Sequence, residues 1–166
     1  SWTFFWNLPV SQFYHVALDN KSPYNVYGGL QDNGSWKAPS QKAGGIKNGD
    51  WEGLYGGDGF WVQPDGEDPD VVYAESQGGS MGRINRKYNM SQSIQPKQGP
   101  GDEELRFNWN TPIVRSFTNP KVLYTGSQYL YKTMDKGITW IKISPDLTTN
   151  DKTKQTNNIN GSELAN

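Results

Sequence analysis

The sequence lacks cysteine, has a single histidine and is poor in apolar residues, which make up 33% of its 166 residues. Without cysteine the chain forms no disulfide and has no thiolate for catalysis or metal binding. It has no uninterrupted apolar run of about eighteen residues, so the sequence predicts no membrane-spanning helix. Basic residues number 16 and acidic residues 17, and the net charge of −1 argues against nucleic acid or an anionic membrane as a partner.

Aromatic residues compensate for the scarcity of aliphatic ones. The chain has 7 Trp, 9 Tyr and 6 Phe, and each of these buries more area than an aliphatic side chain. Its 19 Gly and 10 Pro indicate many turns between short elements. The composition therefore predicts an all-β fold.

A short motif, Pro-x-x-Val/Leu-Tyr, occurs three times, at residues 23–27, 69–73 and 120–124. The spacing of about 50 residues is typical of propeller blades, each built from four short strands. We predict a β-propeller fragment of about three four-stranded blades plus one strand of a preceding blade. The expected units are residues 1–9 (the outer strand of a preceding blade), 10–56, 57–98 and 99–147 (three blades), and 148–166 (a polar tail or linker).

Three blades leave open sheet edges, whereas closed propellers typically need four to eight blades. We therefore expect an excerpt of a longer protein, with the remaining blades supplied by the parent chain or by other chains of an assembly. Expressed alone, residues 1–166 are not expected to form a stable monomer.

A tight turn follows the third motif. An aspartate accepts hydrogen bonds from the backbone just after it, and a glycine supplies a positive φ. The string resembles the Asp box of the BNR repeat and matches each of its defining positions, which are Thr133, Asp135, Gly137, Thr139 and Trp140. We interpret Asp135 as a holder of the turn and not as a catalytic carboxylate.

Further strings extend this resemblance over nearly the whole chain, at residues 12–16, 23–36, 57–60, 106–110 and 143–151. They look like sortilin or Vps10-like BNR-repeat proteins, large exported bacterial proteins that are often labelled glycosyl hydrolases. The resemblance implies a multi-bladed propeller that is extracellular, on the cell surface or periplasmic. It does not imply an activity, because the repeat is scaffold.

Two functions remain open, and a third class, a purely structural spacer in a cell-surface assembly, gains if no ligand is found. The leading hypothesis is a non-catalytic propeller segment that binds a peptide or a glycan. The alternative is a glycoside hydrolase with paired carboxylates in its cleft, since residues 57–60 look like an aspartate-bearing loop of xyloglucanase-type propellers. Its candidate residues are Asp58 with a second carboxylate as partner, which is Asp32, Glu75 or a residue of the missing blades. The arginine triad of sialidases cannot be assigned.

Turns between the second and third strands of each blade share one face with the links between blades, and propellers usually bind ligands on such a face. Most of these residues also have a structural interpretation: the aspartates and Asn33 as turn formers, the glutamines as bridges between blades, and Trp109 as part of the core. The candidate ligand-binding residues are Gln31, Asp32, Asn33, Asp58, Gln77, Arg106, Asn108, Trp109 and Gln128.

No cofactor and no metal site are expected. Asp65, Glu67, Asp68 and Asp70 offer oxygen ligands for Ca²⁺, but their spacing is unlike an EF-hand, and we interpret them as a solvated loop. The single histidine, His15, lies within a predicted strand and is interpreted as packed rather than as a base or metal ligand.

Overall fold

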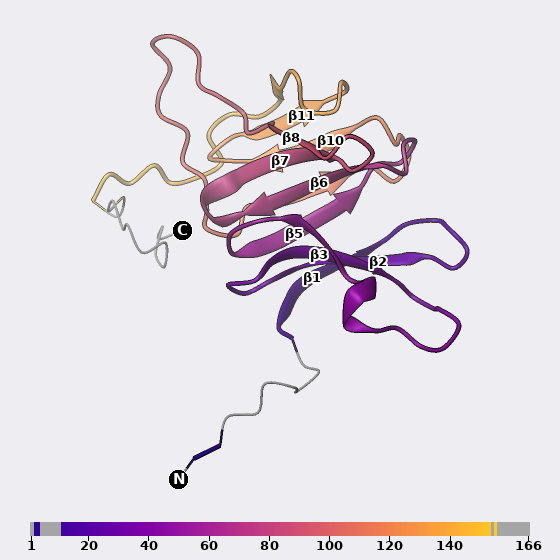
Figure 1. Cartoon of the computed structure of the whole chain (residues 1–166). Coiled ribbons are helices and arrows are strands. Elements are labelled where there is room, and N and C mark those ends of the chain that lie inside the picture. The colour runs from indigo at the N-terminus through magenta and orange to yellow at the C-terminus, as the bar shows by residue number, and fades with distance from the viewer. Residues whose placement is uncertain (1, 4–10, 154, 156–166) are drawn as a thin grey trace.

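The computed structural model describes residues 2–3, 11–153 and 155, and strands dominate this part of the chain (Figure 1). Its regular structure comprises twelve strands in three antiparallel sheets of four strands each, together with two short 3-10 turns. The prediction of an all-β protein is confirmed. No helix within the described residues is long and apolar enough to cross a membrane.

Each sheet is formed by four strands that follow one another in the sequence and pair in that order. The first sheet contains β1 (Phe13–Leu18), β2 (Asn25–Leu30), β3 (Gly34–Pro39) and β4 (Glu52–Tyr55). The second contains β5 (Gly59–Pro64), β6 (Val71–Ser76), β7 (Ser80–Asn85) and β8 (Met90–Ser93). The third contains β9 (Ile113–Arg115), β10 (Leu123–Gly126), β11 (Leu130–Thr133) and β12 (Ile141–Lys142). The 3-10 turns are η1 (Asn48–Asp50) and η2 (Gln77–Gly79).

The second sheet lies between the other two (Figure 1). All six residues of β6 are buried, because both faces of this strand are covered. Val72 and Ala74 point to a core shared with the first sheet. Val71 and Tyr73 point to a core shared with the third sheet, where Trp61, Phe107 and Trp140 also pack. The alternation along one strand thus supplies two separate cores.

Glycines allow the first and second sheets to approach closely. A Cβ atom on Gly29 would lie 2.3 Å from the carbonyl carbon of Gly59, and one on Gly59 would lie 2.2 Å from the Gly34 oxygen. Any side chain at either position would push the backbones apart. This contact fixes the link from β4 to β5 against the β2–β3 turn.

The same backbone hydrogen bond recurs at the loop between the first two strands of each sheet. The amides of Asp19, Asp65 and Ser116 donate to the carbonyls of Asn25, Val71 and Val122, at 3.3, 3.0 and 2.9 Å. Each donor directly follows the first strand of its sheet. The three sheets are therefore repeats of one structural unit.

One strand differs from its sequence-based placement. The pattern predicts the third strand of the second sheet near residues 82–88, but β7 ends at Asn85 and Tyr88 lies in the turn that follows. Asn89 has a φ of 49°, and the side chain of Asn85 accepts a hydrogen bond from the Tyr88 amide. The turn chemistry of these asparagines ends the strand early.

The predicted outer strand at residues 1–9 falls almost entirely outside the described residues. At the other end, residues 148–153 form turns and bends. Most of the predicted polar tail or linker, residues 148–166, lies outside the described residues, and in its described part Thr148 and Lys152 make side-chain contacts with Arg106 and Glu103.

Candidate functional site

The structure brings four predicted site residues together, namely Asp58, which precedes β5, and three residues that contact it. The Asp32 amide donates to Asp58 Oδ1 at 2.9 Å, and the Trp109 indole nitrogen donates to Oδ2 at 3.3 Å. The Asp58 amide in turn donates to Gln77 Oε1 at 2.7 Å. Both carboxylate oxygens are thus engaged in joining the β2–β3 turn to the segment that leads into the third sheet.

Glu75, the other candidate carboxylate, is fully buried on β6. Its Oε1 accepts a hydrogen bond of 3.0 Å from the Thr111 amide, which ties the second sheet to the start of the third. Burial raises the pKa of Glu75 to about 8, and the nearby charge of Asp58 adds to this rise. The side chain is therefore mostly protonated at neutral pH and is closed to solvent.

The recurring glutamines hold the segments that enter their own sheets. Gln77 accepts from the Asp58 amide before β5. Gln128 accepts from the Arg106 amide at 2.8 Å and donates to the Glu104 carbonyl at 2.9 Å. Gln128 is only 1% exposed, so it lies beneath the segment that carries Glu104 and Arg106 and holds its backbone in place. Gln31, at the matching position in the first sheet, is exposed.

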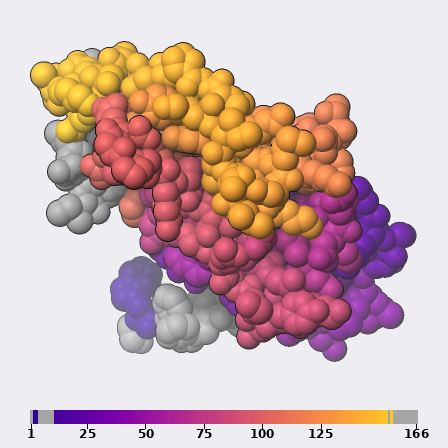
Figure 2. Space-filling model, turned by 90° about the horizontal axis from the view of Figure 1, so that it is seen from above, coloured from indigo at the N-terminus to yellow at the C-terminus, as the bar shows by residue number. Residues whose placement is uncertain are grey.

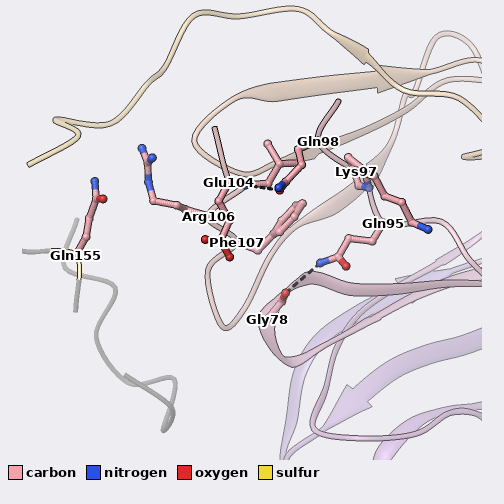
Figure 3. Close-up of a pocket in the computed structure, with 10 residues that line it drawn as sticks. Gly78, Gln95, Lys97, Gln98, Glu104, Arg106, Phe107 and Gln155 are labelled. Carbon is pink, nitrogen blue, oxygen red and sulfur yellow. Dashed lines mark hydrogen bonds between the residues drawn. The ribbon is translucent and has the colours of Figure 1, made fainter. Parts of the chain in front are cut away.

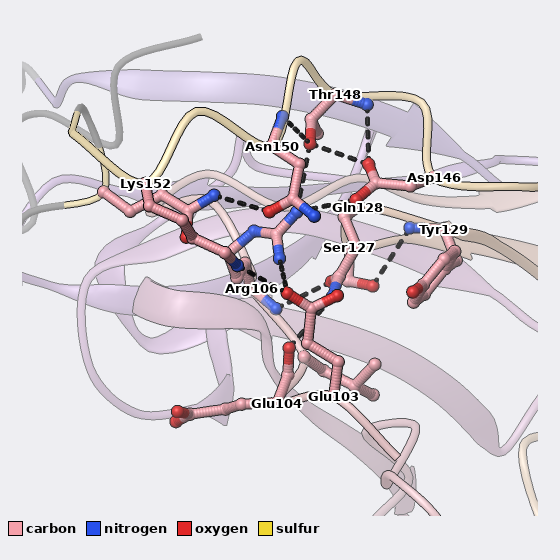
Figure 4. Close-up of polar contacts among 12 residues, drawn as sticks. Glu103, Glu104, Arg106, Ser127, Gln128, Tyr129, Asp146, Thr148, Asn150 and Lys152 are labelled. Carbon is pink, nitrogen blue, oxygen red and sulfur yellow. Dashed lines mark hydrogen bonds and ion pairs between the residues drawn. The ribbon is translucent and has the colours of Figure 1, made fainter.

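The segment between β8 and β9, residues 94–112, is called the second linker here. Arg106 is the centre of a polar network that joins this linker to residues 146–152 (Figure 4). Its guanidinium donates to Glu103 and Asp146, both at 2.9 Å, and to the Thr148 hydroxyl at 3.0 Å. Lys152 completes the network by pairing with Glu103 at 2.7 Å. Figure 2 shows the resulting surface, on which the yellow C-terminal segment lies beside the salmon-coloured linker.

A cavity of about 740 Å³ opens between η2 and this linker (Figure 3). Gln95 closes one side, since its Nε2 donates to the Gly78 carbonyl at 3.2 Å. Of the predicted ligand-binding residues only Arg106 lines it. The remaining lining residues are Gly78, Gln95, Pro96, Lys97, Gln98, Glu104, Leu105, Phe107 and Gln155. These side chains mix amides, both signs of charge and an aromatic ring.

The other predicted site residues lie outside this cavity. Asp32 and Asn33 are exposed in the β2–β3 turn, where the Asn33 side chain donates to the Gln31 carbonyl at 2.8 Å. Asn108 lies in a loop and accepts from the Asn110 amide at 3.1 Å. The cavity walls could not be predicted from the sequence. Residues 95–107 form a linker without regular structure, and such a segment has no periodic pattern of apolar residues.

The Asp135 carboxylate is occupied by donors of its own turn. Thr139 donates from its amide to Oδ1 at 2.9 Å and from its hydroxyl to Oδ2 at 2.6 Å. The Thr133 hydroxyl donates to Oδ1 at 2.7 Å and accepts from the Gly137 amide at 3.1 Å. These hydrogen bonds, chiefly those from Thr139, lower the pKa of Asp135 to about 2. Trp140 anchors the turn by donating to the Ile94 carbonyl at 2.6 Å.

His15 stacks on Trp61 with ring centroids 3.8 Å apart. The Trp61 indole donates to Asn110 Oδ1 at 2.8 Å, which leaves the amide nitrogen of Asn110 facing His15 Nε2 at 3.4 Å. Burial lowers the pKa of His15. The ring therefore packs between the sheets.

One residue of the acidic loop, Asp65, is not solvated as expected from the sequence, whereas the side chains of Glu67 and Asp70 are 42% and 44% exposed. The Asp65 side chain is only 2% exposed and pairs with Lys136 at 3.3 Å. Its oxygens also accept hydrogen bonds from the Asp68 amide and the Tyr73 hydroxyl. Burial raises the pKa of Asp65, but these donors outweigh burial, and the pKa lies below its usual value. Asp65 is a structural residue that was mistaken for surface.

The described residues contain no group of three or more His, Cys, Asp or Glu side chains placed to hold a metal ion. Fold and site together define an all-β protein of repeated four-stranded sheets with a polar cavity beside the second linker. No protein-family model matches the chain, and a search of curated proteins found no match.

Proposed function

We propose that this chain is a non-catalytic, ligand-binding segment of a BNR-repeat β-propeller in a larger exported, sortilin-like protein. The three sheets are taken as consecutive blades. Their matching strand order and the recurring loop hydrogen bond support this assignment. So does the third-sheet turn, whose hydrogen bonds suit the scaffold role of an Asp box.

The observation that carries the binding function is the open cavity of about 740 Å³ beside the second linker. Its volume is within the usual range of ligand pockets, roughly 300–1,000 Å³. Amide, ammonium, carboxylate and aromatic groups line it together, and the wall around Arg106 is braced by ion pairs. Such a surface suits an extended polar polymer, which presents many hydrogen-bonding groups and some apolar area.

The state of the carboxylates supports a non-catalytic role. Asp58 has both oxygens engaged by Asp32 and Trp109, and Glu75 is buried away from any substrate. One observation favours the second candidate, a glycoside hydrolase. The pKa of Glu75 is raised to about 8, chiefly by burial and in part by Asp58, and a carboxyl group with a raised pKa is what glycosidases use as a general acid.

A binding screen tests the proposal. The protein is incubated with a glycan array and with an immobilised peptide library, and any binder is titrated against two double variants. Lys97→Ala/Gln98→Ala removes two side chains of the cavity, and we expect binding at least about tenfold weaker. Lys87→Ala/Gln92→Ala removes the same residue types from the β7–β8 region, and the affinity should stay within about threefold.

Absence of any binder in both libraries, or equal affinity of both double variants, contradicts the proposal. The hydrolase is tested separately by incubation with β-glucans. Release of reducing ends by the protein, and its loss in Asp58→Asn, would establish that function instead.

A further inference from the structure

We propose that the ligand is an uncharged glycan chain and that an aromatic subsite beside the main cavity holds one of its sugar rings. This inference rests on the proposed binding function and names its ligand class. The subsite is a second cavity, of about 200 Å³, walled by Tyr129, Tyr131 and Trp140. Its other lining residues are Lys97, Gln98, Asp102, Glu103, Leu105 and Lys142.

The two cavities adjoin each other. Lys97, Gln98 and Leu105 line both of them, so these residues form a shared divide. The Leu105 amide donates to Gln98 Oε1 at 3.4 Å, which holds the two sides of the divide together. A chain lying over this divide would reach Phe107 at one end and the aromatic subsite at the other. The pair of cavities therefore suits an oligomer better than a single small molecule.

The aromatic walls are held in place before any ligand arrives. Trp140 is fixed by the hydrogen bond from its indole nitrogen to the Ile94 carbonyl, at 2.6 Å. Tyr131 is 7% exposed and belongs to β11. Lys142 places its ammonium 4.4 Å from the centre of the Tyr129 ring, a cation–π contact that orients this ring. A preformed wall loses little conformational entropy on binding.

The chemistry of the walls matches a sugar ring. Aromatic faces accept the C–H face of a pyranose, while Tyr and Trp side chains lose little rotamer freedom. The surrounding amide, ammonium and carboxylate groups offer both donors and acceptors to ring hydroxyls. A sugar ring has the complementary surface, with a flat apolar C–H face and hydroxyl groups at its edge.

Charge argues for a neutral chain. Lys97 and Lys142 are balanced by Asp102 and Glu103 among the lining residues. Glu103 is itself paired with Arg106 and Lys152. A wall with balanced charges gives no net electrostatic attraction to a charged polymer. An anionic polymer would be repelled by the two carboxylates, and a cationic one by the two lysines.

The test is affinity electrophoresis through gels that contain one soluble polymer each. The neutral polymers are mixed-linkage β-glucan, xyloglucan and galactomannan, and the charged ones are polygalacturonate and chitosan. Three variants are compared with the unmodified protein. Tyr129→Ala removes the ring, Tyr129→Phe keeps it, and Tyr88→Ala removes an exposed tyrosine from the turn between β7 and β8.

We expect at least one neutral polymer to retard the protein. Tyr129→Ala should weaken that binding about tenfold, while Tyr129→Phe and Tyr88→Ala stay within about twofold. Thermal melting of the two alanine variants checks that both are folded. The Tyr129 amide donates to the Ser127 hydroxyl and the Tyr129 carbonyl accepts from the Ser127 amide, and neither contact depends on the ring.

If a neutral glycan binds equally well to Tyr129→Ala, the aromatic subsite is wrong although the proposed binding function stands. Retardation only by a charged polymer, or binding only of peptides in the earlier screen, overturns the neutral-glycan ligand. Absence of every binder overturns both proposals.

Discussion

The hydroxyl group of Tyr73 donates a hydrogen bond of 2.5 Å to the Asp65 carboxylate, eight residues earlier in the chain. Tyr27 makes the same contact with Asp19, at 3.0 Å and the same separation. In the third sheet the residue at this spacing from Tyr124 is Ser116, which has no carboxylate. The first two sheets thus share a tyrosine–aspartate hydrogen bond between their first loop and their second strand. The third sheet has a serine in place of the aspartate and lacks this bond.

We expect Tyr73→Phe and Tyr27→Phe to lower the free energy of unfolding by about 1–3 kcal/mol, because each leaves a partly or fully buried carboxylate short of a donor. Tyr124→Phe is the matched control and should change it by less than about 0.5 kcal/mol. Urea denaturation of the three variants measures these differences. Equal losses in all three would show that the carboxylates do not matter.

The buried Glu75 predicts an unusual dependence of stability on pH. Its pKa is raised to about 8 in the folded protein and is about 4.5 when exposed. The folded state therefore binds the proton more tightly, and this stabilising contribution is complete below about pH 4.5 and is lost as the pH rises to about 8. Glu75→Gln removes the titration and should stabilise the protein at pH 8 by a few kcal/mol, on the order of the energy of the pKa shift.

Thermal melts of the Glu75→Gln variant and the unmodified protein at pH 5, 7 and 8 measure this effect. The difference in melting temperature should widen steadily with pH. A constant difference would mean that Glu75 does not titrate in this range.

The Asp135 turn predicts the opposite dependence at acid pH. The pKa of Asp135 is lowered to about 2, so its carboxylate stabilises the fold above about pH 4, and that contribution is lost as the pH falls toward 2. Asp135→Ala should lower the free energy of unfolding by about 1–2 kcal/mol at pH 7, as for other side chains that cap backbone amides. The same variant should leave glycan binding within about twofold, since its donors all belong to the turn. Loss of binding with retained stability would point to a functional carboxylate.

The sequence predicted much of the fold because turns and strands are encoded locally. Pro, Gly and Asn mark the strand ends, and the strand-forming runs between them became sheets. The site was less predictable because its contacts join distant residues. Thr111 reaches Glu75 across 36 residues, and Arg106 reaches Asp146 across 40. Glu75 has small neighbours, Ala74 and Ser76, and nothing in this stretch of sequence predicts that its side chain is buried against another sheet.

The cavity was missed for a related reason. Gln95, Lys97 and Gln98 lie in a polar linker that looks like a plain connection in the sequence. Only the position of the third sheet makes this linker the wall of a cavity. Trp140 was assigned to the turn alone, but its ring also faces the smaller cavity, a role that depends on the path of residues 97–105.

Exposed apolar side chains predict self-association of the isolated chain. Val16 and Leu18 on β1 are 62% and 50% exposed, and Ile141 on β12 is 59% exposed. Such surfaces drive association. In sedimentation velocity we expect concentration-dependent oligomers, which Val16→Lys/Ile141→Lys should reduce. Ile46→Lys, in the loop before η1, is the control and should not. A monodisperse monomer with a cooperative melt would contradict this prediction and the incomplete-propeller account.

Hydrogen–deuterium exchange with a neutral glycan present tests the central claim, that the two adjoining cavities bind the ligand. The measurement tolerates oligomers and locates binding along the chain. The account predicts slower exchange in peptides covering residues 95–107 and 127–132, with no change in the peptide covering the β7–β8 turn. Protection confined to that turn or to the β2–β3 turn, with residues 95–107 unchanged, would contradict it.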